Sequence, residues 1–267
     1  MPAFHAPVLA NRALPPDAAV LTVAVPAHLT LEPFQFAMLS IPQDANFPFL
    51  PRPFSVYDAR PGEWDFLIKR VGRGTGGLAD ALPGSTIYVA GPVGNGITKL
   101  PTDRRPIGVA GGVGIAPFLV LYREWLAGRV DVGSQKPLLL FGGRTRDMLY
   151  DLDRFTALPI EVRCSTDDGS FGTKGRVTAL LEQALAEGPA DVLCCGPDPM
   201  MEAVAAVSAR ANTPCRLSLE TFMACGYGVC NACAVMVKDE RFPQGFRYDR
   251  CCVDGPVFDA ATLVHAH

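Results

Sequence analysis

Short strand-like patterns of apolar and polar residues fill the first hundred positions of the chain. The stretches 20–25 and 64–71 are rich in β-branched and aromatic residues and partly alternate between apolar and polar side chains, as half-buried strands do. Prolines and glycines punctuate the segments between them, and no apolar repeat at helical spacing continues beyond two turns. The pattern predicts an antiparallel β-barrel over residues 1–101.

From residue 102 the pattern changes to buried strands that alternate with helices, which indicates a parallel sheet with helices on both faces. Strands are expected at 107–110, 137–141, 160–164 and 191–195, and helices up to residue 128 and over 177–187 and 200–211. This α/β unit is predicted to span residues 102–213. The remaining residues, 214–267, are rich in cysteine and glycine and predict a third, small unit.

Composition narrows the classes of protein to which the chain can belong. Apolar residues make up 49% and charged residues 19% of the chain, which is ordinary for a globular protein with a core. A net charge of −3 without any basic run of five residues argues against nucleic-acid binding. The first ten residues lack the features of a secretory signal, and the uncharged stretch 106–122 is glycine-rich and shorter than the roughly 20 residues of a membrane span. We therefore expect a cytoplasmic protein without a membrane segment.

Nine cysteines without an export signal indicate metal or cofactor chemistry rather than a disulfide framework. Cys225, Cys230 and Cys233 follow the C-x4-C-x2-C spacing of plant-type 2Fe–2S proteins, with glycines between them that let the backbone approach a cluster. The fourth ligand is expected from the adjacent pair Cys251 and Cys252. A structural zinc site is the alternative, although its cysteines usually come as paired C-x2-C units. Three other cysteines lie in apolar, strand-like runs and are expected to be core residues: Cys164, Cys194 and Cys215.

A glycine loop joins the first strand of the α/β unit to its helix. Gly112 and Gly114 would let a dinucleotide pyrophosphate approach the backbone, and the helix that follows offers free N–H groups at its N-terminus. Pro117 at the start of that helix removes only an N–H group that would lack a helical partner. The alternative interpretation is a tight turn without a ligand.

Two other strand ends are predicted to meet at the same edge of the sheet. Asp167 and Asp168 follow the third strand, where a carboxylate could accept hydrogen bonds from a ribose and would repel a 2′-phosphate. This favours NAD over NADP, although a solvated turn is an equal alternative. Cys195 and Gly196 follow the later strand, at the carboxyl edge where ligands bind in such sheets.

A candidate flavin site lies in the barrel segment. Arg52-Pro53-Phe54-Ser55 belongs to one expected strand, and a Gly-x-Gly-Thr turn that ends in Gly74 and Thr75 follows another. An arginine and a serine beside such a turn could hold a diphosphate and the edge of a planar ring. Either motif alone would be unremarkable.

Together these motifs resemble the ferredoxin–NADP reductase superfamily over nearly the whole chain. The resemblance implies that the Arg-x-x-Ser motif binds FAD, that the glycine loop binds the dinucleotide and that Cys195-Gly196 lies beside the nicotinamide. The flavin contacts that it implies are Arg52, Pro53, Phe54, Ser55, Ile68, Lys69, Arg70, Gly74 and Thr75.

Five further segments are similar to the electron-transfer subunit of the NAD-linked, two-subunit dihydroorotate dehydrogenases: residues 91–96, 166–170, 218–220, 223–226 and 252–258. This resemblance implies FAD, a 2Fe–2S cluster, NAD(H) and a partner subunit that carries FMN and oxidises dihydroorotate, in a heterotetramer of two copies each. It selects Cys252 as the fourth cluster ligand and implies that residues 238–250 lengthen the loop beside the cluster. No substrate acid or base is then expected in this chain. The alternative is an NAD(P)H–ferredoxin oxidoreductase or a hydrogenase-linked reductase subunit with the same cofactors.

Overall fold

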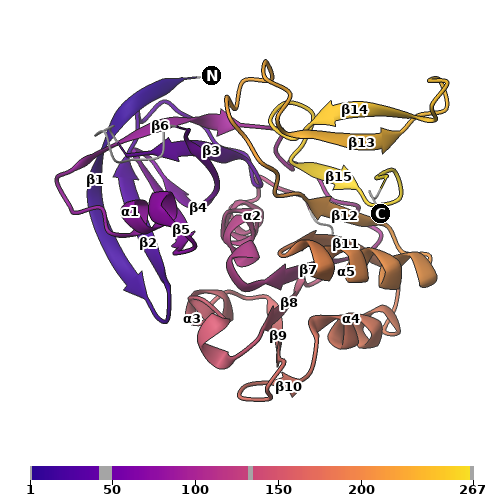
Figure 1. The fold of residues 1–267 in the computed structure, drawn as a ribbon. Helices are drawn as coiled ribbons and strands as arrows, with labels where there is room; N and C mark the ends of the chain where they lie inside the picture. The colour runs from indigo at the N-terminus through magenta and orange to yellow at the C-terminus, as the bar shows by residue number, and fades with distance from the viewer. Residues whose placement is uncertain (1, 42–49, 132–134, 265–267) are drawn as a thin grey trace.

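A closed, six-stranded antiparallel barrel forms the N-terminal part of the computed structural model (Figure 1), which describes residues 2–41, 50–131 and 135–264. Its strands follow the order β1-β2-β5-β4-β3-β6 around the barrel. The elements are β1 (Ala3–Leu14), β2 (Ala18–Ala24), β3 (Phe36–Ser40), β4 (Arg52–Arg60), β5 (Glu63–Lys69), the short helix α1 (Arg73–Ala79) and β6 (Thr86–Val93). Alternate side chains of β5, Trp64, Phe66 and Ile68, fill the barrel core, as strand periodicity requires. The barrel prediction is confirmed.

The second large unit is built on a seven-stranded sheet with the strand order β10-β9-β8-β7-β11-β12-β15. All of its strand pairs are parallel except β12–β15. Its strands are β7 (Arg105–Gly111), β8 (Leu138–Gly143), β9 (Glu161–Thr166), β10 (Thr173–Lys174), β11 (Ala190–Cys195), β12 (Cys215–Ser218) and β15 (Val257–Asp259). The helices are η1 (Gly112–Ile115), α2 (Ala116–Leu126), η2 (Arg146–Met148), α3 (Leu152–Thr156), α4 (Val177–Leu185) and α5 (Asp198–Arg210). The predicted parallel sheet is confirmed.

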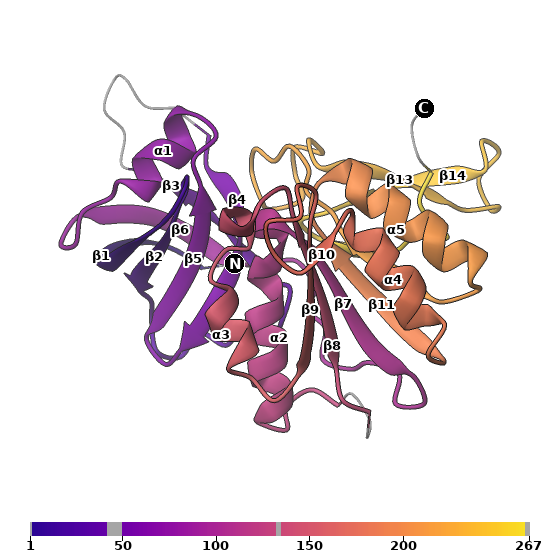
Figure 2. The same ribbon diagram turned by 90° about the horizontal axis from the view of Figure 1, so that it is seen from below.

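Helices cover both faces of this sheet. Leu139 and Phe141 point to one face and pack with α2 and α3, whereas Leu138 and Leu140 point to the other and pack with α4 and α5. Figure 2 shows that α2 and α3 lie between the sheet and the barrel. The face that carries the glycine loop and its helix is therefore the one that meets the barrel.

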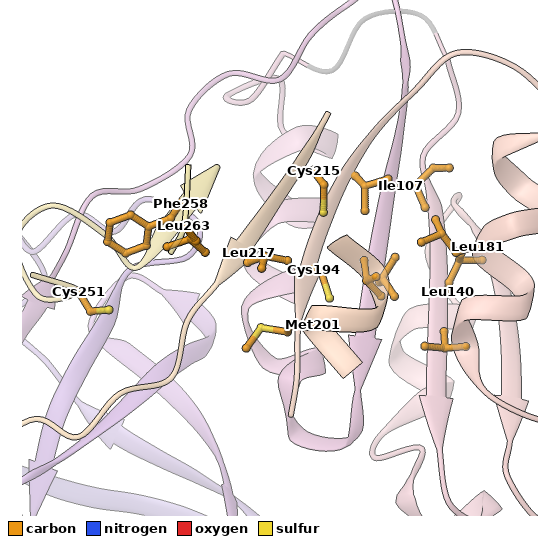
Figure 3. Close-up of a cluster of buried hydrophobic side chains, with 14 of the residues drawn as sticks. Ile107, Leu140, Leu181, Cys194, Met201, Cys215, Leu217, Cys251, Phe258 and Leu263 are labelled. Carbon is orange, nitrogen blue, oxygen red and sulfur yellow. The ribbon is translucent and has the colours of Figure 1, made fainter. Parts of the chain in front are cut away.

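The C-terminal segment is joined to the sheet rather than set apart from it. β12 pairs with β11, and β15 pairs with β12. Figure 3 shows Leu217, Phe258 and Leu263 in the same apolar cluster as Cys194 of β11. The predicted boundary at residues 213 and 214 thus divides units that share one core, and the three-part division stays a prediction.

A β-hairpin occupies the region after the cysteine loop. β13 (Ala234–Lys238) pairs with β14 (Phe246–Arg250), so the expectation that residues 238–250 lengthen a loop is wrong for residue 238 and residues 246–250, which are strand residues. Charged side chains obscure this strand in the sequence, because Arg247 forms ion pairs with Asp239 and Asp249. Among the helices of the described residues, none has the length and apolar character that a membrane crossing requires.

Candidate cofactor sites

The two parts of the proposed flavin motif lie against each other. The guanidinium of Arg52, on β4, covers Gly74 of α1 so closely that a Cβ atom at Gly74 would stand 2.4 Å from its Nε and Cζ atoms. Arg52 Nη1 also donates to the carbonyl oxygen of Leu50 at 2.6 Å. Only a glycine permits this approach, so the Gly-x-Gly-Thr turn and the Arg-x-x-Ser strand form one site.

The other proposed flavin residues divide into two groups. Pro53, Phe54 and Ser55 are half-buried on β4 and face positions 38, 37 and 36 of β3. Ile68 is fully buried in the barrel core, so it could meet a flavin only through its backbone.

Three polar residues of the predicted flavin set already have protein partners. Arg70 binds the carboxylate of Asp80 with two nitrogens, at 2.6 and 2.7 Å. Lys69 Nζ lies 3.6 Å from Asp17. The hydroxyl of Thr75 accepts hydrogen bonds from the N–H groups of residues 71 and 72 at 2.9 and 3.1 Å. Thr75 therefore shapes the turn, while a phosphate would have to share Lys69 and Arg70 with these carboxylates.

The glycine loop begins where β7 ends. Gly112 has a φ of +54°, which favours glycine, and open space lies where its Cβ atom would stand. Gly114 is required for a different reason, because a Cβ atom there would stand 2.3 Å from the carbonyl oxygen of Cys195. The structure thus brings the loop and the Cys195-Gly196 strand end together, as the sequence predicted.

The acidic pair lies at the neighbouring strand end. The carboxylate of Asp168 accepts hydrogen bonds from the Ser170 hydroxyl at 2.7 Å and the Ser170 N–H group at 2.9 Å, which lower its pKa. The Ser170 hydroxyl in turn accepts from the N–H group of Arg146, which follows β8. Asp168 is therefore committed to its own turn, and Asp167 is the better candidate for a ribose contact.

We expect the protein to prefer NADH over NADPH by about 100-fold or more in kcat/KM, because a 2′-phosphate beside Asp167 would bring like charges together at a cost of several kcal/mol. Asp167→Asn should narrow this preference more than Asp168→Asn does. Steady-state rates with both dinucleotides provide the measurement. A preference of the unaltered protein for NADPH would show that the acidic pair lies away from the ribose.

Glu220 has no role in the sequence-based interpretation, which used it only as part of a family segment. β12 runs parallel to β11 in a register that sets Ser218 opposite Cys195, so Glu220 follows at the same carboxyl edge. Burial and then the charge of Glu220 raise the pKa of the Cys195 thiol, while burial and Asp198 raise the pKa of Glu220. Recognising β12 as a strand of the parallel sheet would have revealed this carboxyl group.

The cysteines of the C-terminal segment converge in two pairs. Cys233 Sγ lies 3.3 Å from Cys252 Sγ, and the side chain of Cys230 lies close enough to Cys225 to help lower the pKa of its thiol. Two thiolates on one tetrahedral metal with bonds of about 2.3 Å would stand roughly 3.8 Å apart. The first pair is therefore close to the spacing that one iron requires.

Backbone N–H groups prepare the first cysteine for metal binding. Burial opposes ionisation of Cys225, but N–H groups that include those of Cys230 and Tyr227 point at its sulfur and lower its pKa to about 6. Because the thiolate is the ligand form, this environment favours coordination near neutral pH.

Cys251 and Cys252 differ sharply in their surroundings. Cys251 is fully buried in the apolar cluster of Figure 3, with its thiol toward Thr221. Cys252 instead lies beside Cys233, and burial and that neighbour raise its pKa to about 12. A metal reverses this effect, since a coordinating thiol is deprotonated.

The donor arrangement also bears on the zinc alternative. A structural zinc site needs four ligands on a single ion, whereas a 2Fe–2S cluster divides four thiolates between two irons. The two-pair arrangement therefore fits the cluster better than zinc.

A pocket of about 540 Å³ separates the cysteine loop from the barrel. Its walls include Leu50 and Pro51, which directly precede Arg52, and Cys225 and Tyr227 of the loop. The loop rests on β3, because a Cβ atom at Gly226 would stand 2.6 Å from the Met38 side chain. The Tyr227 hydroxyl lies 3.2 Å from the Tyr88 hydroxyl of β6. The residues directly before the flavin motif and the first cysteine thus line the same pocket.

Comparison with solved structures defines the class of protein as ferredoxin reductase-like oxidoreductases. An NADH-dependent reduced ferredoxin–NADP oxidoreductase matches with a TM-score of 0.82 and 25% identity, covering 97% of this chain and 89% of that chain. A ferredoxin–NADP+ reductase from Neisseria gonorrhoeae with bound FAD and NADP matches with a TM-score of 0.62 and 19% identity, covering 78% of this chain and 91% of that chain.

Family models and curated relatives narrow this class. The iron–sulfur cluster binding domain of dihydroorotate dehydrogenase B matches residues 220–264, and the oxidoreductase NAD-binding domain matches residues 109–206. The dihydroorotate dehydrogenase B (NAD(+)) electron transfer subunit of Caldanaerobacter subterraneus subsp. tengcongensis is 39% identical over 217 residues, which is 81% of either chain. That of Geobacillus kaustophilus is 37% identical over 238 residues, 87% of either chain. The chain belongs to this family of electron transfer subunits, and the resemblance seen in its motifs is confirmed.

Proposed function

We propose that this chain carries electrons to NAD+ from a catalytic subunit that oxidises dihydroorotate. The electrons would pass through a 2Fe–2S cluster and FAD. The observation that carries the proposal is the pocket that Cys225 and Tyr227 of the cysteine loop share with Leu50 and Pro51, the residues directly before β4 and its Arg52. Family membership and the matching iron–sulfur and NAD-binding domains support the same cofactors. When bound, the flavin supplies the exchange between single electrons from the cluster and the hydride that NAD+ accepts.

We assign the cluster ligands from the two thiol pairs. Cys225 and Cys230 would hold one iron, and Cys233 and Cys252 the other. The N–H groups that point at Cys225 would also stabilise the negative charge of the bound cluster. Cys251 would contribute only to the core.

The flavin would be held by β4 and α1, and the nicotinamide by strand ends of the sheet. Arg52 would neutralise the diphosphate, and Ser55 would offer a hydroxyl to the ring edge. On the other side, Gly112 leaves room for the pyrophosphate, and Cys195 and Glu220 lie at the carboxyl edge of neighbouring strands. These groups orient the two rings and exclude water from between them.

The catalytic partner is proposed to carry FMN and to form a heterotetramer with two copies of this chain. Co-purification followed by cofactor analysis and mass measurement tests this proposal. It predicts one FAD, one FMN and two irons for each pair of chains, one chain of each kind, and a mass that corresponds to two such pairs. A partner without FMN would instead support the ferredoxin- or hydrogenase-linked alternative.

The C-terminal segment offers a docking surface for that partner. Among the described residues, six of the eleven exposed large apolar side chains fall within residues 214–267, about a fifth of the chain: Phe222, Tyr227, Val229, Phe242, Tyr248 and Val253. Phe222 is 94% exposed and Val229 is 80% exposed, on either side of the first cysteine. Apolar groups concentrated in this way mark interaction sites, and electron transfer requires the partner to approach the cluster.

We expect Phe222→Asp to weaken binding of the catalytic subunit by about tenfold or more, the scale for an apolar contact residue at an interface. Dihydroorotate-dependent NAD+ reduction should fall with it, while reduction of an artificial dye by NADH stays within about twofold. Leu82→Asp is the matched control, because Leu82 is 72% exposed on the barrel segment. Equal partner affinity for both variants would contradict the assigned surface.

A further inference from the structure

A buried carboxylate joins the flavin strand to the dinucleotide-binding domain. Asp58, three residues after Ser55 on β4, is fully buried. Its Oδ2 atom lies 2.6 Å from Arg154 of α3, 3.0 Å from Arg123 of α2 and 3.1 Å from Arg60 of its own strand. Three arginines thus surround one carboxylate, and two of them come from the other domain.

A second connection leaves the adjacent residue of β4. The fully buried Tyr57 donates its hydroxyl hydrogen to Asp151 at 2.8 Å, and Arg12 of β1 binds the same carboxylate at 2.6 Å. Asp151 immediately precedes α3 and has a φ of +54°, a backbone conformation that residues other than glycine adopt uncommonly. Such strain persists only where the surrounding contacts hold it in place, and the Tyr57 contact is one of these.

These contacts link the two proposed cofactor sites through rigid elements. Arg123 lies in the last turn of α2, and α2 begins directly after the glycine loop η1. Figure 2 shows α2 and α3 side by side between the barrel and the sheet. The path therefore runs from Ser55 along β4 to Asp58, across to Arg123, and along one helix to Gly114.

Charge pairing is a poor way to obtain stability alone, since the cost of removing these groups from water offsets much of their attraction. Directional contacts, however, restrict how one domain can turn against the other. Within the barrel, Arg60 ties Asp58 to Asp65 of β5, which it binds with two nitrogens at 2.9 and 3.0 Å. Arg154 of the other domain lies 3.9 Å from Asp65. An apolar interface of the same size would allow more sliding.

We propose that Tyr57 and Asp58 are positioning residues that fix the flavin strand against the dinucleotide loop for hydride transfer. This inference rests on the proposed function, because it assumes FAD on β4 and a nicotinamide at the glycine loop. Neither residue needs to touch a cofactor. Their effect acts through the distance and angle between the two rings, where a displacement of about 1 Å can cost on the order of 100-fold in rate.

The test uses the complete, FAD-loaded protein with Tyr57→Phe and Asp58→Asn. Tyr57→Phe removes one hydroxyl and keeps the buried ring, so it preserves the fold if Asp58→Asn does not. We expect flavin reduction by NADH in a single turnover to slow by about tenfold or more, with a KM for NADH within about threefold and unchanged FAD content. The long-wavelength charge-transfer absorbance of the NAD-bound, reduced flavin should weaken, and amide hydrogen exchange in α2 should rise.

Arg163→Gln is the matched control. Arg163 binds Glu161 at 2.7 Å and Glu187 at 2.6 Å, within the sheet domain alone. It should lower thermal stability without changing the rate of flavin reduction. Wild-type rates and wild-type hydrogen exchange in both Tyr57→Phe and Asp58→Asn, or equal slowing by Arg163→Gln, would overturn the inference. A wild-type protein whose flavin NADH does not reduce would refute the proposed function instead. In that case, unchanged hydrogen exchange in Tyr57→Phe and Asp58→Asn would still overturn the positioning role of these residues.

Discussion

Cys252→Ser should abolish the iron–sulfur cluster, whereas Cys251→Ser should leave it intact. Cys252 lies 3.3 Å, sulfur to sulfur, from Cys233, while Cys251 points into the apolar core. Loss of a thiolate leaves an iron open to water and hydrolysis. Single replacements of Cys225, Cys230 and Cys233 should have the same effect as Cys252→Ser, because each supplies one of four ligands.

Iron content and the EPR spectrum of the reduced protein measure this expectation directly. Dihydroorotate-dependent NAD+ reduction should disappear together with the cluster, since electrons from the partner lose their path. Dye reduction by NADH should persist, because it requires only the flavin and the dinucleotide site. Loss of the cluster in Cys251→Ser and its retention in Cys252→Ser would reverse the ligand choice. Retention in all five variants would refute the cluster.

Arg52→Ala should weaken FAD binding by about 3 kcal/mol, or roughly 100-fold, the scale for removing a charged hydrogen-bonding group from a site that needs it. Gly74→Ala should have a similar effect although it leaves the arginine in the sequence. A Cβ atom at Gly74 would stand 2.4 Å from the guanidinium, and a flexible side chain can move away from it. The protein should therefore fold while Arg52 loses its position.

Gly76→Ala is the control for Gly74→Ala, because both lie on α1 and open space surrounds the Cβ position at Gly76. Alanine also favours a helix over glycine, so this variant should keep full FAD occupancy. Titration of the FAD-free protein with FAD gives the affinities. Unchanged affinity in both Arg52→Ala and Gly74→Ala would remove this strand from the flavin site.

The barrel and the sheet could be predicted because local patterns report them well. The expected strand at 20–25 corresponds to β2 (Ala18–Ala24), and the expected helix at 200–211 corresponds to α5 (Asp198–Arg210). The alternation of side chains along β5 also predicts that Ile68 points into the barrel, whereas the family resemblance assigned Ile68 to the flavin site. Ile68 shares the inward face of Trp64 and Phe66, so its side chain belongs to the core rather than to the flavin.

Features that depend on long-range pairing escaped prediction. β12 joins the sheet through β11, and β15 returns about forty residues later to pair with β12, which no local periodicity indicates. The role of Glu220 follows from that register. The hairpin strand β14 carries charges that pair across the hairpin, as Arg247 does with Asp239. The contacts of Asp58 with Arg123 and Arg154 likewise join residues more than sixty positions apart.

The most direct test of the account is reconstitution of the chain with its dihydroorotate-oxidising subunit and measurement of NADH formation after dihydroorotate is added. The account predicts NADH formation that requires both subunits, requires FAD, and is lost in Cys233→Ser although that variant still reduces a dye with NADH. NADH formation by the catalytic subunit alone, or at the full rate with Cys233→Ser, would contradict it.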